Sequence, residues 1–132
     1  MAIKAYSYAK DGNRKLSANF AVKEFRCKDG SDPIFIDDEL VTLLQKIRDH
    51  FGKSVTITSA YRTAAHNKAV KGATYSKAAD IRVQGVGVEA VAAYAETLLP
   101  NRGGVGRYPV KAGRAKGWVH VDTRPNKSRW TL

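Results

Sequence analysis

Residues 37–59 read DDELVTLLQKIRDHFGKSVTITS and contain the two most clearly patterned segments of the chain. In the first half an apolar residue recurs every three or four positions, at Leu40, Leu43, Leu44 and Ile47. One of the two leading aspartates is a suitable cap for a helix that ends at about Phe51, where Gly52 follows. Residues 54–59 alternate Val and Ile with β-branched Thr and predict a strand. A helix followed by a strand is therefore the starting point of the fold.

Outward from this stretch, short apolar segments alternate with turns. We predict strands at 78–83, 105–110 and 118–123, a helix at 88–99, and short helices at 19–25 and 63–70. Because helices come first and strands with helical inserts follow, we predict an α+β fold in which a small antiparallel sheet packs with helices against one face. The length of 132 residues suits a single domain, with 1–15 as a polar lead-in and 16–132 as the folded part.

The chain is strongly basic, with 23 Lys and Arg against 12 Asp and Glu and a net charge of +11. Such a surface attracts polyanions, either nucleic acid or the anionic polymers of a bacterial wall. We do not expect nucleic acid, since no stripe of alternating basic and aromatic residues is present. A single cysteine, Cys27, excludes an internal disulfide and is typical of a small buried residue. We expect no membrane insertion and no signal peptide, because neither a long apolar span nor an apolar N-terminal region is seen.

Polar residues interrupt three of the apolar segments. Arg62 follows the strand at 54–59, Asp80 lies within 78–83, and His120 and Asp122 lie two apart in 118–123, on one face of a strand. Each has an ordinary structural interpretation: a surface arginine, a hydrogen-bonded aspartate and a core histidine. Together they bring an aspartate oxygen and a histidine nitrogen, both zinc ligands, to neighbouring strands. The residue pattern alone leaves a metal site and an ion-pair network open.

In their order along the chain, these segments resemble the zinc D-Ala-D-Ala carboxypeptidase family, which includes phage endolysins and murein endopeptidases. The resemblance runs from about Leu16 to Trp130. It rests on ITSAYR at 57–62, HN at 66–67, AADI at 78–81, GVGRY at 104–108, VHVD at 119–122 and RW at 129–130. The order and spacing of these motifs carry the resemblance, and no single motif decides it.

One part of the family pattern is missing. The family's zinc motif reads S-x-H-x-x-G-x-A-x-D with a later His, whereas this chain reads Ser76-Lys77-Ala78-Ala79-Asp80. The first ligand His therefore has no counterpart, and His66 corresponds to a different family position. A loop left out of the sequence, a deliberate deletion and natural loss in an inactive relative all account for the gap.

The resemblance implies a role for each remaining residue. Asp80 and His120 correspond to two ligands of Zn²⁺, and Asp122 is the expected catalytic base, with orientation of a ligand or of Arg124 as the alternative. Several relatives carry an acid at the position of Gly117, a second departure from the pattern. Substrate binding falls to Arg62, Ser59 and Ser76, with the arginine anchoring a carboxylate of the peptide.

The implied function is a zinc-dependent peptidase that cleaves the peptide stems of bacterial peptidoglycan, as a D-Ala-D-Ala carboxypeptidase or an endolysin-type endopeptidase. The alternative is a catalytically inactive wall-binding module on the same scaffold. We expect a monomer encoded by a phage or prophage, which stays in the cytoplasm until release and then reaches the wall.

Overall fold

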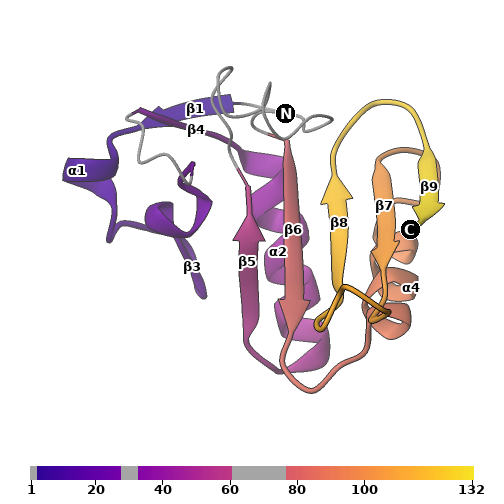
Figure 1. The fold of residues 1–132 in the computed structure, drawn as a ribbon. Helices are drawn as coiled ribbons and strands as arrows, with labels where there is room; N and C mark the ends of the chain where they lie inside the picture. The colour runs from indigo at the N-terminus through magenta and orange to yellow at the C-terminus, as the bar shows by residue number, and fades with distance from the viewer. Residues whose placement is uncertain (1–2, 28–32, 61–76) are drawn as a thin grey trace.

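Helix α2 (Asp38–Phe51) lies against one face of a five-stranded sheet in the computed structural model, which describes residues 3–27, 33–60 and 77–132 (Figure 1). The Asp37 carboxylate accepts the Glu39 N–H at 3.2 Å and begins the helix. Gly52 ends it with φ of +64°, a left-handed conformation that glycine adopts without steric cost. The helix predicted from the sequence is confirmed at both ends.

The sheet runs in the order β5-β6-β8-β7-β9. Its strands are β5 (Val55–Ser59), β6 (Ala78–Val83), β8 (Trp118–Asp122), β7 (Gly104–Tyr108) and β9 (Ser128–Thr131). A second helix, α4 (Val88–Leu98), covers β7 and β8 on the face that α2 also covers (Figure 1). The α+β class and the helices on one face agree with the sequence prediction.

Strand β9 departs from the expected purely antiparallel sheet, because it pairs with β7 in parallel. Strand β8 occupies the position between β6 and β7 and runs antiparallel to both. The chain leaving β8 passes the end of β7 and turns back along its outer edge, which gives β9 the direction of β7. The four residues of β9 were not predicted as a strand.

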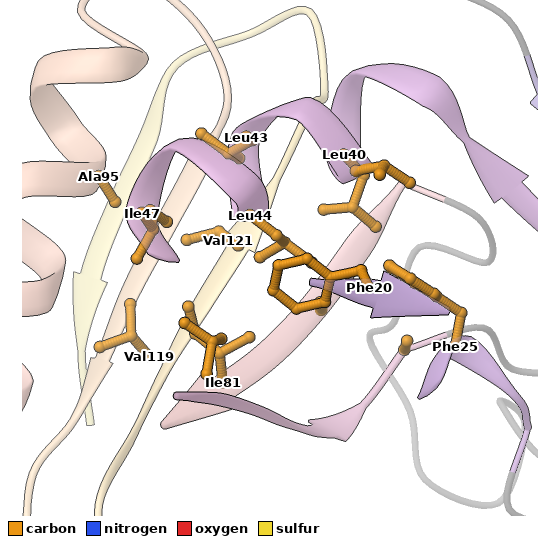
Figure 2. Close-up of a cluster of buried hydrophobic side chains, with 14 of the residues drawn as sticks. Phe20, Phe25, Leu40, Leu43, Leu44, Ile47, Ile81, Ala95, Val119 and Val121 are labelled. Atoms are coloured by element: carbon orange, nitrogen blue, oxygen red, sulfur yellow. The ribbon is translucent and has the colours of Figure 1, made fainter. Parts of the chain in front are cut away.

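The core lies between the helices and the sheet face that they cover. Alternation along the strands turns Ile81, Val119 and Val121 toward Leu44 and Ile47 of α2, and all five side chains are at most 1% exposed (Figure 2). Phe20 and Phe25 extend the same cluster under the N-terminal half of the helix (Figure 2). Because odd-numbered residues of β6 and β8 fill the core, the even-numbered residues occupy the opposite face.

The N-terminal region has more structure than the sequence predicted. Strand β1 (Ile3–Tyr6) pairs with β4 (Ile34–Asp37), so the expected polar lead-in contributes a strand. It continues through α1 (Tyr8–Asp11) and β2 (Lys15–Ser17). In place of the short helix predicted at 19–25, β3 (Phe20–Ala21) precedes the 3-10 helix η1 (Val22–Phe25), where the Glu24 carboxylate accepts the Ala21 N–H at 2.7 Å.

Two further expectations concern single features. The Cys27 side chain is buried, in agreement with the prediction. Within the described ranges, no helix has the length and apolar character needed to cross a membrane. The short helix expected at 63–70 lies outside the described residues.

Candidate metal centre

Asp80 of β6 and His120 of β8 are direct cross-strand partners on the sheet face away from the helices. Directly opposed residues of an antiparallel pair bring their side chains close together. The Asp80 Oδ1 and His120 Nδ1 atoms are 3.0 Å apart, which confirms the proximity expected from the sequence. Asp122 follows two residues later on the same face, as a period of two requires.

The His120 imidazole is held at both nitrogens by carboxylates. Its Nε2 lies 2.7 Å from Asp122 Oδ2, on the edge of the ring opposite Asp80. Burial alone would lower the pKa of His120, but the hydrogen bonds with Asp122 and Asp80 outweigh it and raise the pKa above its ordinary value. The ring is therefore fixed in orientation by two anionic groups.

Asp122 is fully buried, and each of its oxygens accepts hydrogen bonds. Oδ1 accepts the backbone N–H groups of Gly104 at 2.9 Å and Arg124 at 3.1 Å, together with Arg124 Nε–H at 2.8 Å. Oδ2 accepts the Arg124 NH2 group at 2.7 Å as well as the imidazole. Burial would raise the pKa of this carboxyl, but the bonds from His120 and Arg124 hold the pKa well below its usual range. Asp122 is thus an ionised acceptor, and the Nε2 that faces it carries the hydrogen.

Two glycines of β7 make space for this arrangement. A Cβ atom at Gly104 would meet the Asp122 carboxylate, and one at Gly106 would meet the Trp130 indole. Gly106 is the β7 partner of both His120 and Trp130, so the indole lies over the glycine. The rings of His120 and Trp130 are 5.1 Å apart, and the Arg124 guanidinium lies over the indole at 5.4 Å. The histidine thus has an aromatic wall on the side away from Asp80.

The donor chemistry fits two ligands of a zinc ion. With Nε2–H donated to Asp122, Nδ1 is the nitrogen on the side of Asp80. Once it gives up the proton of its hydrogen bond with Asp80, Nδ1 could bind a metal while the second carboxylate orients the ring. In the described part of the chain, no three His, Cys, Asp or Glu side chains converge to hold a metal. The reason is visible in the geometry: Asp122 lies behind the ring and not beside Asp80. A catalytic zinc usually has three protein ligands, so a third would have to come from outside the described residues.

A family model described as Peptidase M15 matches residues 16–122, which include the Asp80–His120 pair and Asp122. The chain belongs to the M15 family of peptidases. Searches of curated proteins and of solved structures give no significant match. Membership places this chain among metallopeptidases, a family that typically uses zinc, and it agrees with the resemblance seen in the motifs.

The family resemblance led us to expect an acid at the position of Gly117, which directly precedes β8. A Cβ atom here would lie 2.6 Å from the Tyr108 carbonyl oxygen and 2.7 Å from Val88 Cγ2. Both distances are far below ordinary contact, so a larger residue requires the backbone to shift. The glycine is therefore part of the packing between β7, β8 and the start of α4.

The other M15 positions have different outcomes. Ser59 lies at the end of β5 as the register partner of Asp80. It therefore borders Asp80 and His120, the two candidate metal ligands, which we call the metal pair. Arg62, His66 and Ser76 lie outside the described residues, and their roles stay predictions. The contact of Asp122 with Arg124 was the alternative expected for Asp122, whereas the role of Trp130 beside His120 was not predicted. The signal that points to Trp130 is the pair of glycines within a strand, because such glycines often mark the close approach of another group.

Proposed function

We propose that the M15 site of this chain is a zinc-peptidase site for the peptide stems of bacterial peptidoglycan. The observation that carries the proposal is the line Asp80–His120–Asp122, in which one carboxylate faces the His120 Nδ1 atom and the other fixes the ring. An ion-pair network without a metal would make the same contacts, and the match to Peptidase M15 over residues 16–122 is what favours a metal site at this pair.

Asp80 and His120 would hold the ion in this proposal. Zinc, when bound, polarises a scissile carbonyl and lowers the pKa of a bound water. Asp122 was expected to act as the base, but its oxygens are saturated with hydrogen bonds and its depressed pKa makes it a weak proton acceptor. We therefore assign Asp122 the alternative role, that of a positioning residue for His120.

The substrate side of the proposal rests on the family resemblance. Arg62 would anchor a carboxylate of the stem, with Ser59 and Ser76 as further contacts. The register of Ser59 opposite Asp80 supports that part of the proposal. The proposal covers both carboxypeptidase action at D-Ala-D-Ala and endolysin-type endopeptidase action. A monomeric protein of phage or prophage origin that reaches the wall after release is consistent with either.

A second candidate function is a wall-binding module without catalysis. Two observations favour it: the described residues supply two ligands, and Gly117 has no room for the acid that several relatives carry there. Such a module would keep affinity for peptidoglycan without holding zinc.

Metal content and lysis separate the two functions. The purified chain, Asp80→Asn and His120→Gln should be compared for zinc per chain by elemental analysis and for release of amino groups from purified peptidoglycan. The proposal predicts zinc in the parent chain that both substitutions remove, with peptide release only where zinc is bound. Retained binding to peptidoglycan by a zinc-free parent chain would establish the wall-binding module instead.

A further inference from the structure

A second row of side chains lies next to the metal pair on the same sheet face. Arg82 is two residues beyond Asp80 on β6, and Trp118 is two residues before His120 on β8. A period of two places both on the face of the metal pair, one step of about 7 Å further along the strands. Trp118 is in turn the register partner of Tyr108 on β7.

Arg82 differs from the other arginines of this sheet. Arg107 is paired with Glu89 and Glu96, and Arg129 also lies near Glu96. In the described part of the chain, Arg82 has no carboxylate partner, and its Nε–H donates to the Gly117 carbonyl at 2.8 Å. That bond fixes the plane of the guanidinium, and within the described ranges no acceptor contacts the four N–H donors of its two terminal nitrogens.

Two stacked aromatic rings, those of Tyr108 and Trp118, belong to the same row as this guanidinium. The rings of Tyr108 and Trp118 are stacked at 4.8 Å with an angle of 11° between their planes. Arg114 lies over both rings, and its NH1 group donates to the carbonyls of Pro109 and Leu132. Because Arg114 is held by backbone carbonyls, it fixes the aromatic pair in place and leaves Arg82 as the unpaired cation of the row.

We propose that Arg82, with Trp118 as its apolar floor, forms a second substrate-binding subsite for a carboxylate. A planar guanidinium whose two terminal nitrogens face the ligand is suited to bidentate binding of a carboxylate, and an indole to packing of an aliphatic segment. At about 3.3 Å per residue, an extended peptide that reaches from the metal pair to this row spans two to three residues. The subsite therefore selects peptides with a free carboxylate two or three residues from the scissile bond, and it rests on the proposed peptidase function.

Two synthetic stem peptides test the subsite, one with free internal carboxylates and one with those carboxylates amidated. Binding is measured on the metal-free protein from the shift of the Trp118 indole N–H resonance, and kcat/KM is measured separately with zinc present. We expect the parent chain to bind the free-carboxylate peptide about ten-fold more tightly. Arg82→Gln should abolish that preference, and Arg82→Lys, which keeps the charge without the fork, should retain part of it.

Arg26→Gln is the matched control, because Arg26 also donates a guanidinium hydrogen to a backbone carbonyl, that of Lys23, at an exposed position outside the sheet. It should leave the preference unchanged. Equal affinity of the parent chain for both peptides, or a preference that survives in Arg82→Gln, would overturn the subsite. If Arg82→Gln does not fold, a full preference in Arg82→Lys would overturn bidentate binding. A parent chain that discriminates by binding but cleaves neither peptide with zinc would instead overturn the peptidase function and leave the subsite standing.

Discussion

His120 is held between carboxylates that come from different strands, and the support extends through Asp122 to Arg124. A metal-bound histidine depends on such a partner for its tautomer and its orientation. The same carboxylate also accepts the Gly104 N–H, so it joins the site to the backbone of β7. The position of the imidazole is thus fixed by the sheet as well as by its neighbours.

Asp122→Asn is expected to lower zinc affinity by about 10- to 100-fold, because the amide loses the ionised acceptor that holds Nε2–H. Competition with a chelating dye measures the affinity, and thermal unfolding measures stability in parallel. Asp38→Asn is the control, since Asp38 is half-exposed and pairs only with Lys4 among the described residues. Unchanged zinc affinity in Asp122→Asn would show that the ring is oriented by other contacts.

Gly106→Ala should destabilise the fold by about 1–3 kcal/mol, because its methyl group would overlap the Trp130 indole. The indole would also move from His120, so tryptophan fluorescence should change along with the unfolding midpoint. Gly87→Ser is the control, since a Cβ at Gly87 meets no atom within 4 Å and serine suits its N-cap position. If Gly106→Ala left the free energy of unfolding unchanged, the Trp130 indole would have to shift more easily than its close packing on Gly106 indicates.

At the scale of elements, Glu39 of α2 is joined to Arg102, which precedes β7, by a contact of 2.6 Å. Arg102 also donates to the Thr123 carbonyl just after β8. The hydrogen bond from Arg102 lowers the pKa of Glu39 below 4.5 against the opposing effect of burial. A carboxyl whose pKa is lowered in the folded state stabilises the fold above its unfolded pKa, and that contribution is lost as the pH falls through the folded value.

The melting temperature of the parent chain should therefore exceed that of Glu39→Gln above a pH of about 4.5, with the gap closing in more acidic solution. Both groups are about one-third exposed, so solvent screening keeps the gap small. In an Arg102→Gln background the Glu39 substitution should have a smaller effect above pH 4.5, because the bond from Arg102 is the largest cause of the lowered Glu39 pKa. An undiminished gap in that background would assign the effect to another partner of Glu39.

The sequence that leads into β6 lacks part of the family's zinc motif. Inserting a segment of the form x-H-x-x-G between Ser76 and Lys77 should raise both zinc affinity and peptide release, because it restores a third ligand. The same segment with Gln in place of His is the control for loop length. Strong zinc-dependent lysis by the chain without the insertion would show that another residue, such as His66, already supplies the third ligand.

The elements that the sequence predicted are those whose patterns match their environment. Helix α2 and strand β6 each bury one regular face, so periodicity located them. Strand β1 was not predicted because its residues before Tyr6 are exposed and show no apolar alternation. Strand β9 was not predicted because pairing with β7, and not an apolar pattern, holds its four residues in the sheet. At the site, Asp80 and His120 stood out as polar residues in apolar strands, whereas the contact of Trp130 with His120 depends on tertiary placement that local pattern does not encode.

At the scale of the whole molecule, charge is the dominant feature, with a net value of +11. Some of it surrounds a hollow of about 470 Å³ between the N-terminal strands and α2, lined by Lys4, Arg14, Lys15 and Lys46 among others. This hollow is remote from the metal pair and does not include its residues. The basic residues that line this hollow are therefore a separate feature from the site.

Adsorption to intact bacterial walls should weaken steeply as salt rises from about 0.05 to 0.5 M, because the Debye length shrinks across this range and attraction to anionic wall polymers is screened. Pelleting with walls at each salt concentration measures the bound fraction. Walls stripped of anionic polymers are the control and should bind less protein with a shallower salt dependence. Salt-independent adsorption would assign wall affinity to the peptide site alone.

The insertion of β8 between β6 and β7 also constrains the order of folding. Strand β7 precedes β8 in the chain, but β6 and β7 do not pair with each other. The sheet therefore cannot form across this position until β8 has paired with both. Asp80 and His120, forty residues apart and cross-strand partners, meet only when that pairing forms. Non-local closure of this kind is a slow step. A partly folded chain would therefore have no metal pair, and metal capture would report the completion of the sheet.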